Sequence, residues 1–111
     1  MVRLFFLFAV FASWPANAAE LLIFTADWCG PCQLLKTDIK AEPDILENYE
    51  WGYVDFENEK ELSAVYSVTT VPTFLILENN AVIVRRVGYR GPEDLKSWLQ
   101  NRKLKRFMFR Q

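Results

Sequence analysis

Residues 20–32 read Glu-Leu-Leu-Ile-Phe-Thr-Ala-Asp-Trp-Cys-Gly-Pro-Cys, and this stretch decides the fold. Its first six residues form a nearly continuous apolar run, which is typical of a strand buried on both faces of a sheet. Behind the cysteines, Leu34, Leu35 and Ile39 recur at helical spacing and predict an amphipathic helix. A strand that runs directly into two cysteines at the start of a helix indicates a redox-active pair.

The position of each cysteine on this helix predicts its role. Cys29 is expected at the N-terminus, where unpaired N–H groups and the helix macrodipole favour a thiolate. The thiolate is the attacking species in disulfide exchange. Cys32 follows one turn later, where it is shielded and placed to resolve the mixed disulfide. Between them, Pro31 is tolerated because the first helical turn needs no backbone donor from it, and Gly30 leaves room for the backbone of a partner.

Other uses of the cysteine pair remain open at this point. A purely structural disulfide across two intervening residues would close a very small loop and remove little entropy from the unfolded chain. A zinc site would need two further ligands, and the chain has no histidine, although a metal bridging two copies of the chain would gain them. We therefore expect catalysis by the thiols alone, with no metal and no cofactor. An inert disulfide stays an alternative.

The whole chain predicts one α/β domain, because 111 residues leave room for no more. Asn79 and Asn80 tolerate the positive φ of a hairpin turn, and Leu62 and Val65 give the shortest helix its apolar side. The apolar patterns predict further strands at residues 51–56, 73–77 and 81–87, and helices at 34–49 (interrupted at Pro43), at 57–66 and from Pro92 onward. This order implies a four-stranded mixed sheet with helices on both faces.

Three motifs resemble the thioredoxin family, and they occur in the family's order. Residues 28–32, Trp-Cys-Gly-Pro-Cys, match the active-site motif of that family residue for residue. Val71-Pro72-Thr73 is similar to the cis-proline segment that faces the active site in the family. Val87-Gly88 is similar to the glycine that lies beyond the last strand.

This resemblance covers residues 21–99 and implies a shortened thioredoxin-like fold with thiol–disulfide oxidoreductase activity. It implies that Pro72 is cis and that the backbone of Val71 is offered to an extended peptide substrate. It also implies that Trp28 lies at the active-site surface and, with the two residues between the cysteines, supports them.

The sequence departs from the family in two respects. The mature chain begins where the second element of thioredoxin would begin, so the family's first strand and helix have no counterpart. The aspartate that lies beneath the cysteines in thioredoxin corresponds to Ile23, and its lysine partner corresponds approximately to Trp51. The resemblance therefore leaves open which group deprotonates Cys32, and we expect slower turnover than in thioredoxin.

Residues 1–18 have the features of a signal peptide that precedes a domain at residues 19–101. Arg3 supplies a basic start, residues 4–12 are apolar, and Ala16-Asn17-Ala18 fits the pattern of a cleavage site. This segment predicts export, to the periplasm if the source is Gram-negative. A buried first element and an uncleaved membrane anchor are the alternatives, although the apolar run is shorter than the ~20 residues that span a bilayer.

The C-terminal residues 102–111 interleave five basic residues with four apolar ones. This pattern is typical of a fraying helix end, or of a segment that contacts an anionic membrane surface or an acidic partner. The net charge of the chain is −1, which gives no case for nucleic acid as a partner.

Together these features predict an exported oxidoreductase that reduces disulfides in protein substrates. Gly30-Pro31 between the cysteines resembles the reducing members of the family, and no histidine is present to stabilise the Cys29 thiolate. An exported reductant requires electrons, so we expect a membrane partner that supplies them. The alternatives are an oxidant or isomerase of folding proteins, and a redox-inactive binding module.

Overall fold

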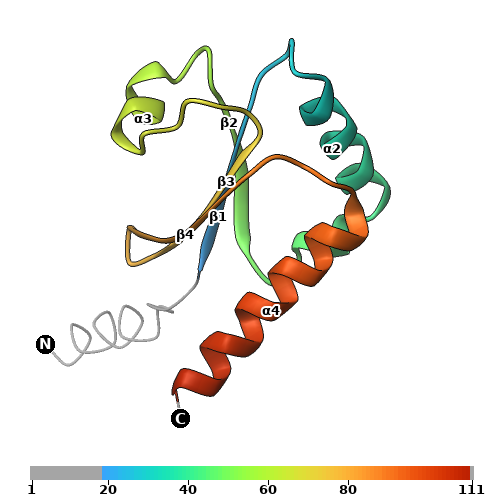
Figure 1. Ribbon diagram of the computed structural model, residues 1–111, viewed down its shortest axis with the longest axis vertical. Helices are drawn as coiled ribbons and strands as arrows, with labels where there is room; N and C mark the ends of the chain where they lie inside the picture. Colours follow the sequence, from blue (N-terminus) through green and yellow to red (C-terminus); the bar gives the residue numbers. More distant parts are fainter. Residues whose placement is uncertain (1–18, 111) are drawn as a thin grey trace, which may run out of the picture.

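The computed structural model describes residues 19–110, which form four strands and four helices (Figure 1). The elements are β1 (Glu20–Thr25), α2 (Gly30–Ala41), the 3-10 helix η1 (Pro43–Leu46), β2 (Glu50–Asp55), α3 (Lys60–Val65), β3 (Thr73–Glu78), β4 (Ala81–Val87) and α4 (Pro92–Arg110). Their order confirms the predicted α/β architecture. The predicted signal peptide, residues 1–18, lies outside the described residues.

The strands form a mixed sheet in the order β2-β1-β3-β4. β1 pairs in parallel with β2 and antiparallel with β3, and β3 pairs antiparallel with β4. The parallel pair requires a crossover, which α2 and η1 provide. The hairpin between β3 and β4 turns at Asn79 and Asn80, whose φ angles of 53° and 66° match the predicted turn.

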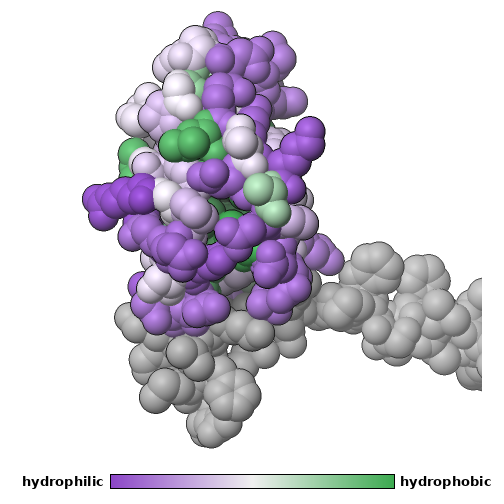
Figure 2. All heavy atoms as spheres, turned by 90° about the vertical axis from the view of Figure 1, so that its right-hand side faces the viewer, coloured by the Kyte–Doolittle hydropathy of each residue, from purple (hydrophilic) through white to green (hydrophobic). Residues whose placement is uncertain are grey.

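Helices cover both faces of the sheet, which explains the apolar runs of β1 and β3. In Figure 1, α2, η1 and α4 lie on one face and α3 lies on the other. The larger core joins the sheet to α2, η1 and α4 through buried side chains that include Leu21, Ile23, Leu35, Ile39, Leu46, Phe74, Ile76, Leu95 and Leu99. The smaller core, under α3, contains Phe24, Val54, Val68, Leu75 and Leu77. The outer surface on the side of α2 and α4 is mostly hydrophilic, with small apolar patches (Figure 2).

Two of the apolar residues in the predicted helical patterns lie on the surface of the confirmed helices. Leu34 is 56% exposed, because the inner side of α2 runs through Cys32, Leu35 and Ile39. Val65 is 74% exposed, because α3 has only six residues and turns Ser63 toward the sheet instead.

The boundaries of two helices follow from local chemistry. α2 ends at Ala41 and η1 begins at Pro43, as the proline predicts. α3 begins at Lys60, later than predicted, because Oδ1 of Asp55 accepts the N–H groups of Glu57 and Asn58 at 2.9 and 3.2 Å. That carboxylate holds the chain in a turn before the helix begins.

α4 continues without a break past residue 101, where the domain was predicted to end, and reaches Arg110. Its first turn contains Glu93 and Asp94, whose negative charges suit a helix N-terminus. Within the described residues, no helix has the length and apolar character needed to cross a bilayer.

Tyr89 links the loop before α4 to α2 through a hydrogen bond. Its Oη donates a hydrogen bond to Oδ2 of Asp38 at 2.6 Å. Burial, that hydrogen bond and the nearby carboxylates raise the pKa of Tyr89 above the ordinary value for tyrosine. The loop begins at Gly88, whose φ of 94° favours glycine and whose N–H donates to the Pro72 carbonyl oxygen at 2.8 Å. The loop therefore connects the helix that carries Cys32 to the segment around Pro72.

Replacing Tyr89 by Phe should lower the free energy of unfolding by about 1 kcal/mol at neutral pH, because it leaves Asp38 without this donor. The pKa of Tyr89 is higher in the folded protein than in the unfolded chain. The stabilisation is therefore complete below the unfolded pKa and is lost as the pH rises through the folded pKa. Urea unfolding of the two proteins should give a constant difference up to about pH 9 and a shrinking one above about pH 10.

Tyr66→Phe is the matched control for this experiment. Tyr66 packs against Phe24, and within the described residues its hydroxyl makes no hydrogen bond. The control should unfold like the parent protein at every pH. A Tyr89→Phe difference that stayed constant into strongly alkaline solution would contradict the assignment.

Candidate active site

The two cysteines lie where β1 delivers the chain to the N-terminus of α2. Cys29 is the N-cap residue, with an extended backbone (φ −90°, ψ 111°), and its N–H donates to the Ala26 carbonyl oxygen at 3.1 Å. Gly30 is the first residue of the helix and Pro31 the second. Pro31 costs no hydrogen bond there, because the first N–H groups of a helix have no partner within it.

The sulfur of Cys29 caps the helix. Its Sγ accepts a hydrogen bond from the N–H of Cys32 at 3.2 Å. An N-cap acceptor that carries negative charge is stabilised by this donor and by the helix macrodipole. The arrangement therefore favours a thiolate on Cys29 when the pair is reduced.

The pair forms a disulfide in this structure, with 5.2 Å between the two Cα atoms. Cys32 is completely buried, whereas Cys29 retains 4% of its surface. An incoming sulfur therefore meets Cys29 first, as the sequence predicts for the attacking cysteine.

The surroundings of the disulfide are apolar. The cysteines pack with Ala26, Phe56 and Val71. In the described part of the chain, the polar contacts of the two sulfurs are the Cys32 N–H and the Val71 carbonyl oxygen. The same part of the chain contains no group of three or more cysteine or acidic side chains that could hold a metal ion.

The position of the buried family aspartate is occupied by Ile23, which is fully buried. The strand register pairs Tyr53 with Ile23 and Trp51 with Leu21, so the neighbour of Ile23 on β2 is Tyr53 and not Trp51. Burial raises the pKa of Tyr53, and Nζ of Lys36 lies 5.1 Å from the centroid of its ring. An apolar side chain on β1 and a phenol on β2 are therefore neighbours at this point of the sheet.

The Val71–Pro72 segment faces Cys29 from the other side. The peptide bond between these residues is cis, as the resemblance implies. The Val71 carbonyl oxygen lies 3.7 Å from Sγ of Cys29. The β3 ladder begins only at Thr73, so the peptide group of Val71 is outside the sheet pairing. Its predicted role in binding a peptide stays a prediction.

Trp28 forms the exposed edge of the site. Its side chain is 67% exposed, and its Nε1 donates to Oε1 of Glu57 at 3.0 Å. Glu57 was not predicted from the sequence, because only the turn at Asp55 brings it to this position. Glu57 also borders a groove of about 590 Å³, which is lined by Phe56, Glu57, Lys60, Ser63, Ala64, Ser67, Val68 and Thr69.

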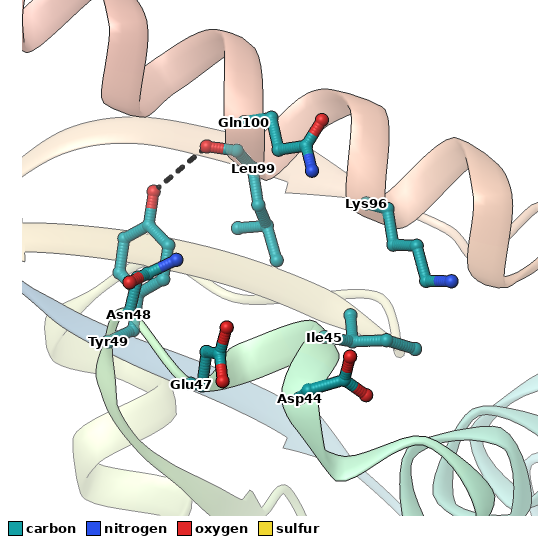
Figure 3. Close-up of a pocket in the computed structure, with 8 residues that line it drawn as sticks. All are labelled: Asp44, Ile45, Glu47, Asn48, Tyr49, Lys96, Leu99 and Gln100. Carbon is teal, nitrogen blue, oxygen red and sulfur yellow. Dashed lines mark hydrogen bonds between the residues drawn. The ribbon is translucent and has the colours of Figure 1, made fainter.

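A second hollow, of about 230 Å³, lies between η1 and α4 (Figure 3). Across it, Oη of Tyr49 donates to the Leu99 carbonyl oxygen at 3.3 Å. Lys96 at its edge forms ion pairs with Glu42 and Glu93. Its lining contains no thiol, and its contacts join η1 to α4, so it is separate from the redox site.

Similar sequences and structures are found among known thioredoxins. The family model described as Thioredoxin matches residues 10–101, which includes part of the predicted signal peptide. Thioredoxin from Mycoplasma genitalium is 29% identical over 74 residues, or 67% of this chain and 72% of that protein. Thioredoxin H-type from Fagopyrum esculentum is 31% identical over 81 residues, or 71% of this chain and 70% of that protein. The X-ray structure of Fasciola hepatica thioredoxin superposes with a TM-score of 0.67 at 25% identity, covering 86% of this chain and 89% of that one.

The match to the family model spans most of the chain, and the cysteines stand at the helix N-terminus opposite a cis proline. The chain therefore belongs to the thioredoxin family and is a thiol–disulfide oxidoreductase with Cys29 and Cys32 as its redox-active pair.

Proposed function

We propose that this chain is an exported reductant of disulfides in protein substrates. The position of Cys29 carries the proposal, because its sulfur caps α2 and lies 3.7 Å from the Val71 carbonyl oxygen. A backbone edge beside a nucleophilic sulfur suits an extended peptide, which can hydrogen-bond to the edge on either side of its own cysteine.

The reaction requires two exchanges. The Cys29 thiolate attacks one sulfur of the substrate disulfide, a new S–S bond forms, and the second substrate sulfur leaves as a thiolate that takes up a proton. Cys32 then loses its proton and attacks Sγ of Cys29, which releases the first substrate sulfur. The substrate gains two electrons and two protons, and the protein is left with the Cys29–Cys32 disulfide.

The surroundings of Cys32 suggest where its proton goes. Ile23 supplies no acceptor, and the cysteines pack among Ala26, Phe56 and Val71. Water at the exposed edge or the departing substrate thiolate must therefore accept the proton. This requirement supports the expectation of slower turnover than in thioredoxins that have an internal carboxylate.

The groove beside Glu57 supports a protein substrate rather than a small thiol. It begins at the residue that holds Trp28 and continues past Phe56 along α3. A side chain of a peptide bound along Val71 would have space there, while its cysteine meets Cys29.

The groups that stabilise the thiolate support the proposed direction of the reaction. The sulfur of Cys29 accepts a hydrogen bond from the Cys32 N–H and lies at the positive end of the helix dipole. The chain has no histidine to add a full positive charge. A less stabilised reduced form makes a stronger reductant, since strong oxidants owe their potential to a stabilised reduced form.

Export rests on the pattern of residues 1–18, namely a basic start, an apolar run and a small-residue cleavage pattern. The proposed location is the periplasm or another extracytoplasmic compartment. Disulfides accumulate in such compartments, so a reductant there needs a continuing supply of electrons. We infer a membrane protein that carries reducing equivalents across the bilayer as its electron donor.

The reduction potential tests the direction. Equilibration of the purified protein with glutathione and dithiothreitol buffers should give a value near that of thioredoxin, about −270 mV. Pro31→His is an informative comparison, because an imidazolium beside Cys29 would stabilise the thiolate. The reduction potential of this variant should be less negative than that of the parent protein by at least about 30 mV, which corresponds to a tenfold change in the exchange equilibrium.

A reduction potential of about −120 mV for the parent protein would make it an oxidant and overturn the proposed direction. A disulfide that exchanged with neither buffer would instead favour the redox-inactive binding module.

Export is tested by producing the full chain in a Gram-negative host and sequencing the N-terminus of the protein in the periplasmic fraction. The expected N-terminal residue is Ala19. Ala18→Asp should block cleavage, because the site requires a small residue. Recovery of an uncleaved chain only from the cytoplasm would refute export.

A further inference from the structure

α4 extends well beyond the last of its residues that is described in the core. Leu95 and Leu99 of its first half are buried in the larger core, and Trp98 packs beside them. Leu99 is the last α4 residue of that core among those whose side chains the structure describes, and the helix continues to Arg110. The last nine residues, 102–110, are here named the distal α4 segment.

The distal α4 segment is strongly basic. It contains five basic residues and no acidic ones, whereas the first turn of the same helix contains Glu93 and Asp94. Cations near a helix C-terminus are favoured by the macrodipole, but that effect is limited to about the last turn. Arg102 and Lys103 lie eight and seven residues before the end of the helix, so the dipole does not account for them.

Helical spacing separates the two kinds of residue in this segment. At about 100° per residue, Leu104, Phe107 and Met108 share one side of the helix. The opposite side holds Arg102, Lys103, Lys105, Arg106 and Arg110, with Phe109 as the single apolar residue among them. A basic amphipathic helix of this kind is typical of segments that lie in the interface of a bilayer.

The helical register sets this apolar side apart from the stripe of α4 that packs on the core. The stripe that packs on the core runs through Leu95 and Leu99 and continues, in steps of three and four, to Arg102 and Arg106. The cations thus continue the core-facing side, and the apolar positions lie on the opposite side. Leu104, Phe107 and Met108 therefore do not continue the core stripe along the helix.

We propose that the distal α4 segment binds the surface of an anionic lipid bilayer. Arg and Lys residues would contact lipid phosphates, and the apolar positions would enter the boundary between headgroups and acyl chains. An acidic protein partner would account for the charges, but it would not require an apolar stripe on the other side of the helix. The separation of the two sides therefore favours the bilayer.

Binding of the distal α4 segment to a bilayer would determine where the active site lies relative to that bilayer. In Figure 1, α4 ends at the lower end of the molecule, where β1 begins, and the start of α2 with Cys29 lies at the upper end. Attachment through the distal α4 segment would hold the domain at the bilayer with its disulfide directed away from it. The redox site would remain accessible to substrates in the adjoining compartment.

The test is cosedimentation of the full chain with phosphatidylcholine vesicles that do or do not contain phosphatidylglycerol. The charge variant is Lys103→Gln, Arg106→Gln and Arg110→Gln. Its matched control is Lys40→Gln, Lys60→Gln and Arg90→Gln, which removes the same charge from exposed positions outside α4. All proteins keep residues 1–18, so differences between them report α4.

The parent chain should prefer the anionic vesicles at an ionic strength of about 0.1 M. The charge variant should bind them at least about 30-fold more weakly, since each basic residue near such a surface contributes about fivefold. The control should remain within about twofold of the parent. Replacing Leu104, Phe107 and Met108 by Ser should also weaken binding, by at least about tenfold.

Three results would overturn the proposal: equal binding of the parent to both vesicle types, equal effects of the charge variant and its control, or full binding by the Ser variant. The last would indicate a purely electrostatic contact, as expected for an acidic protein partner. Circular dichroism of each variant checks that the fold is retained.

Discussion

The first N–H groups of α2 have no partners within the helix. One of them, the N–H of Cys32, donates a hydrogen bond to the sulfur of Cys29. This hydrogen bond puts the reactive sulfur at the positive end of the helix dipole, where a thiolate is favoured over a thiol. The rest of the fold keeps that helix end in place. β1 delivers the chain to it, the larger core holds α2 against the sheet, and the Val71–Pro72 segment closes the other side of the sulfur.

The site combines this helix end with an apolar interior. Ile23 stands where the family has a buried carboxylate, and its neighbour on β2 is Tyr53. A carboxylate is unnecessary for attack by Cys29, because the helix end stabilises that thiolate. A nearby carboxylate would matter for Cys32, because this residue is fully buried and must lose a proton before it resolves the mixed disulfide. We therefore expect the same exchange chemistry with a slower second step.

The parts of the structure that could be predicted are those with local causes. An apolar run followed by two spaced cysteines predicts β1 and the start of α2, and adjacent asparagines predict the β3–β4 turn. Glu57 could not be found in this way, because it lies 29 residues from Trp28 and only the fold brings them together. The choice between Trp51 and Tyr53 depends on strand register, which no local pattern fixes. α4 passes the predicted boundary because Arg, Lys, Leu and Met favour a helix and neither Gly nor Pro follows Pro92.

The central claim is that Cys29 attacks and Cys32 resolves. It is tested most directly by incubating reduced Cys32→Ser and Cys29→Ser proteins with insulin, quenching with acid, and identifying covalent adducts by intact mass and peptide mapping. The account predicts that Cys32→Ser accumulates a mixed disulfide on Cys29, because no second thiol releases it. Cys29→Ser should form at least about tenfold less adduct, since Cys32 is buried and lies inside the helix. Equal or faster adduct formation on Cys32 would contradict the assignment of the two roles.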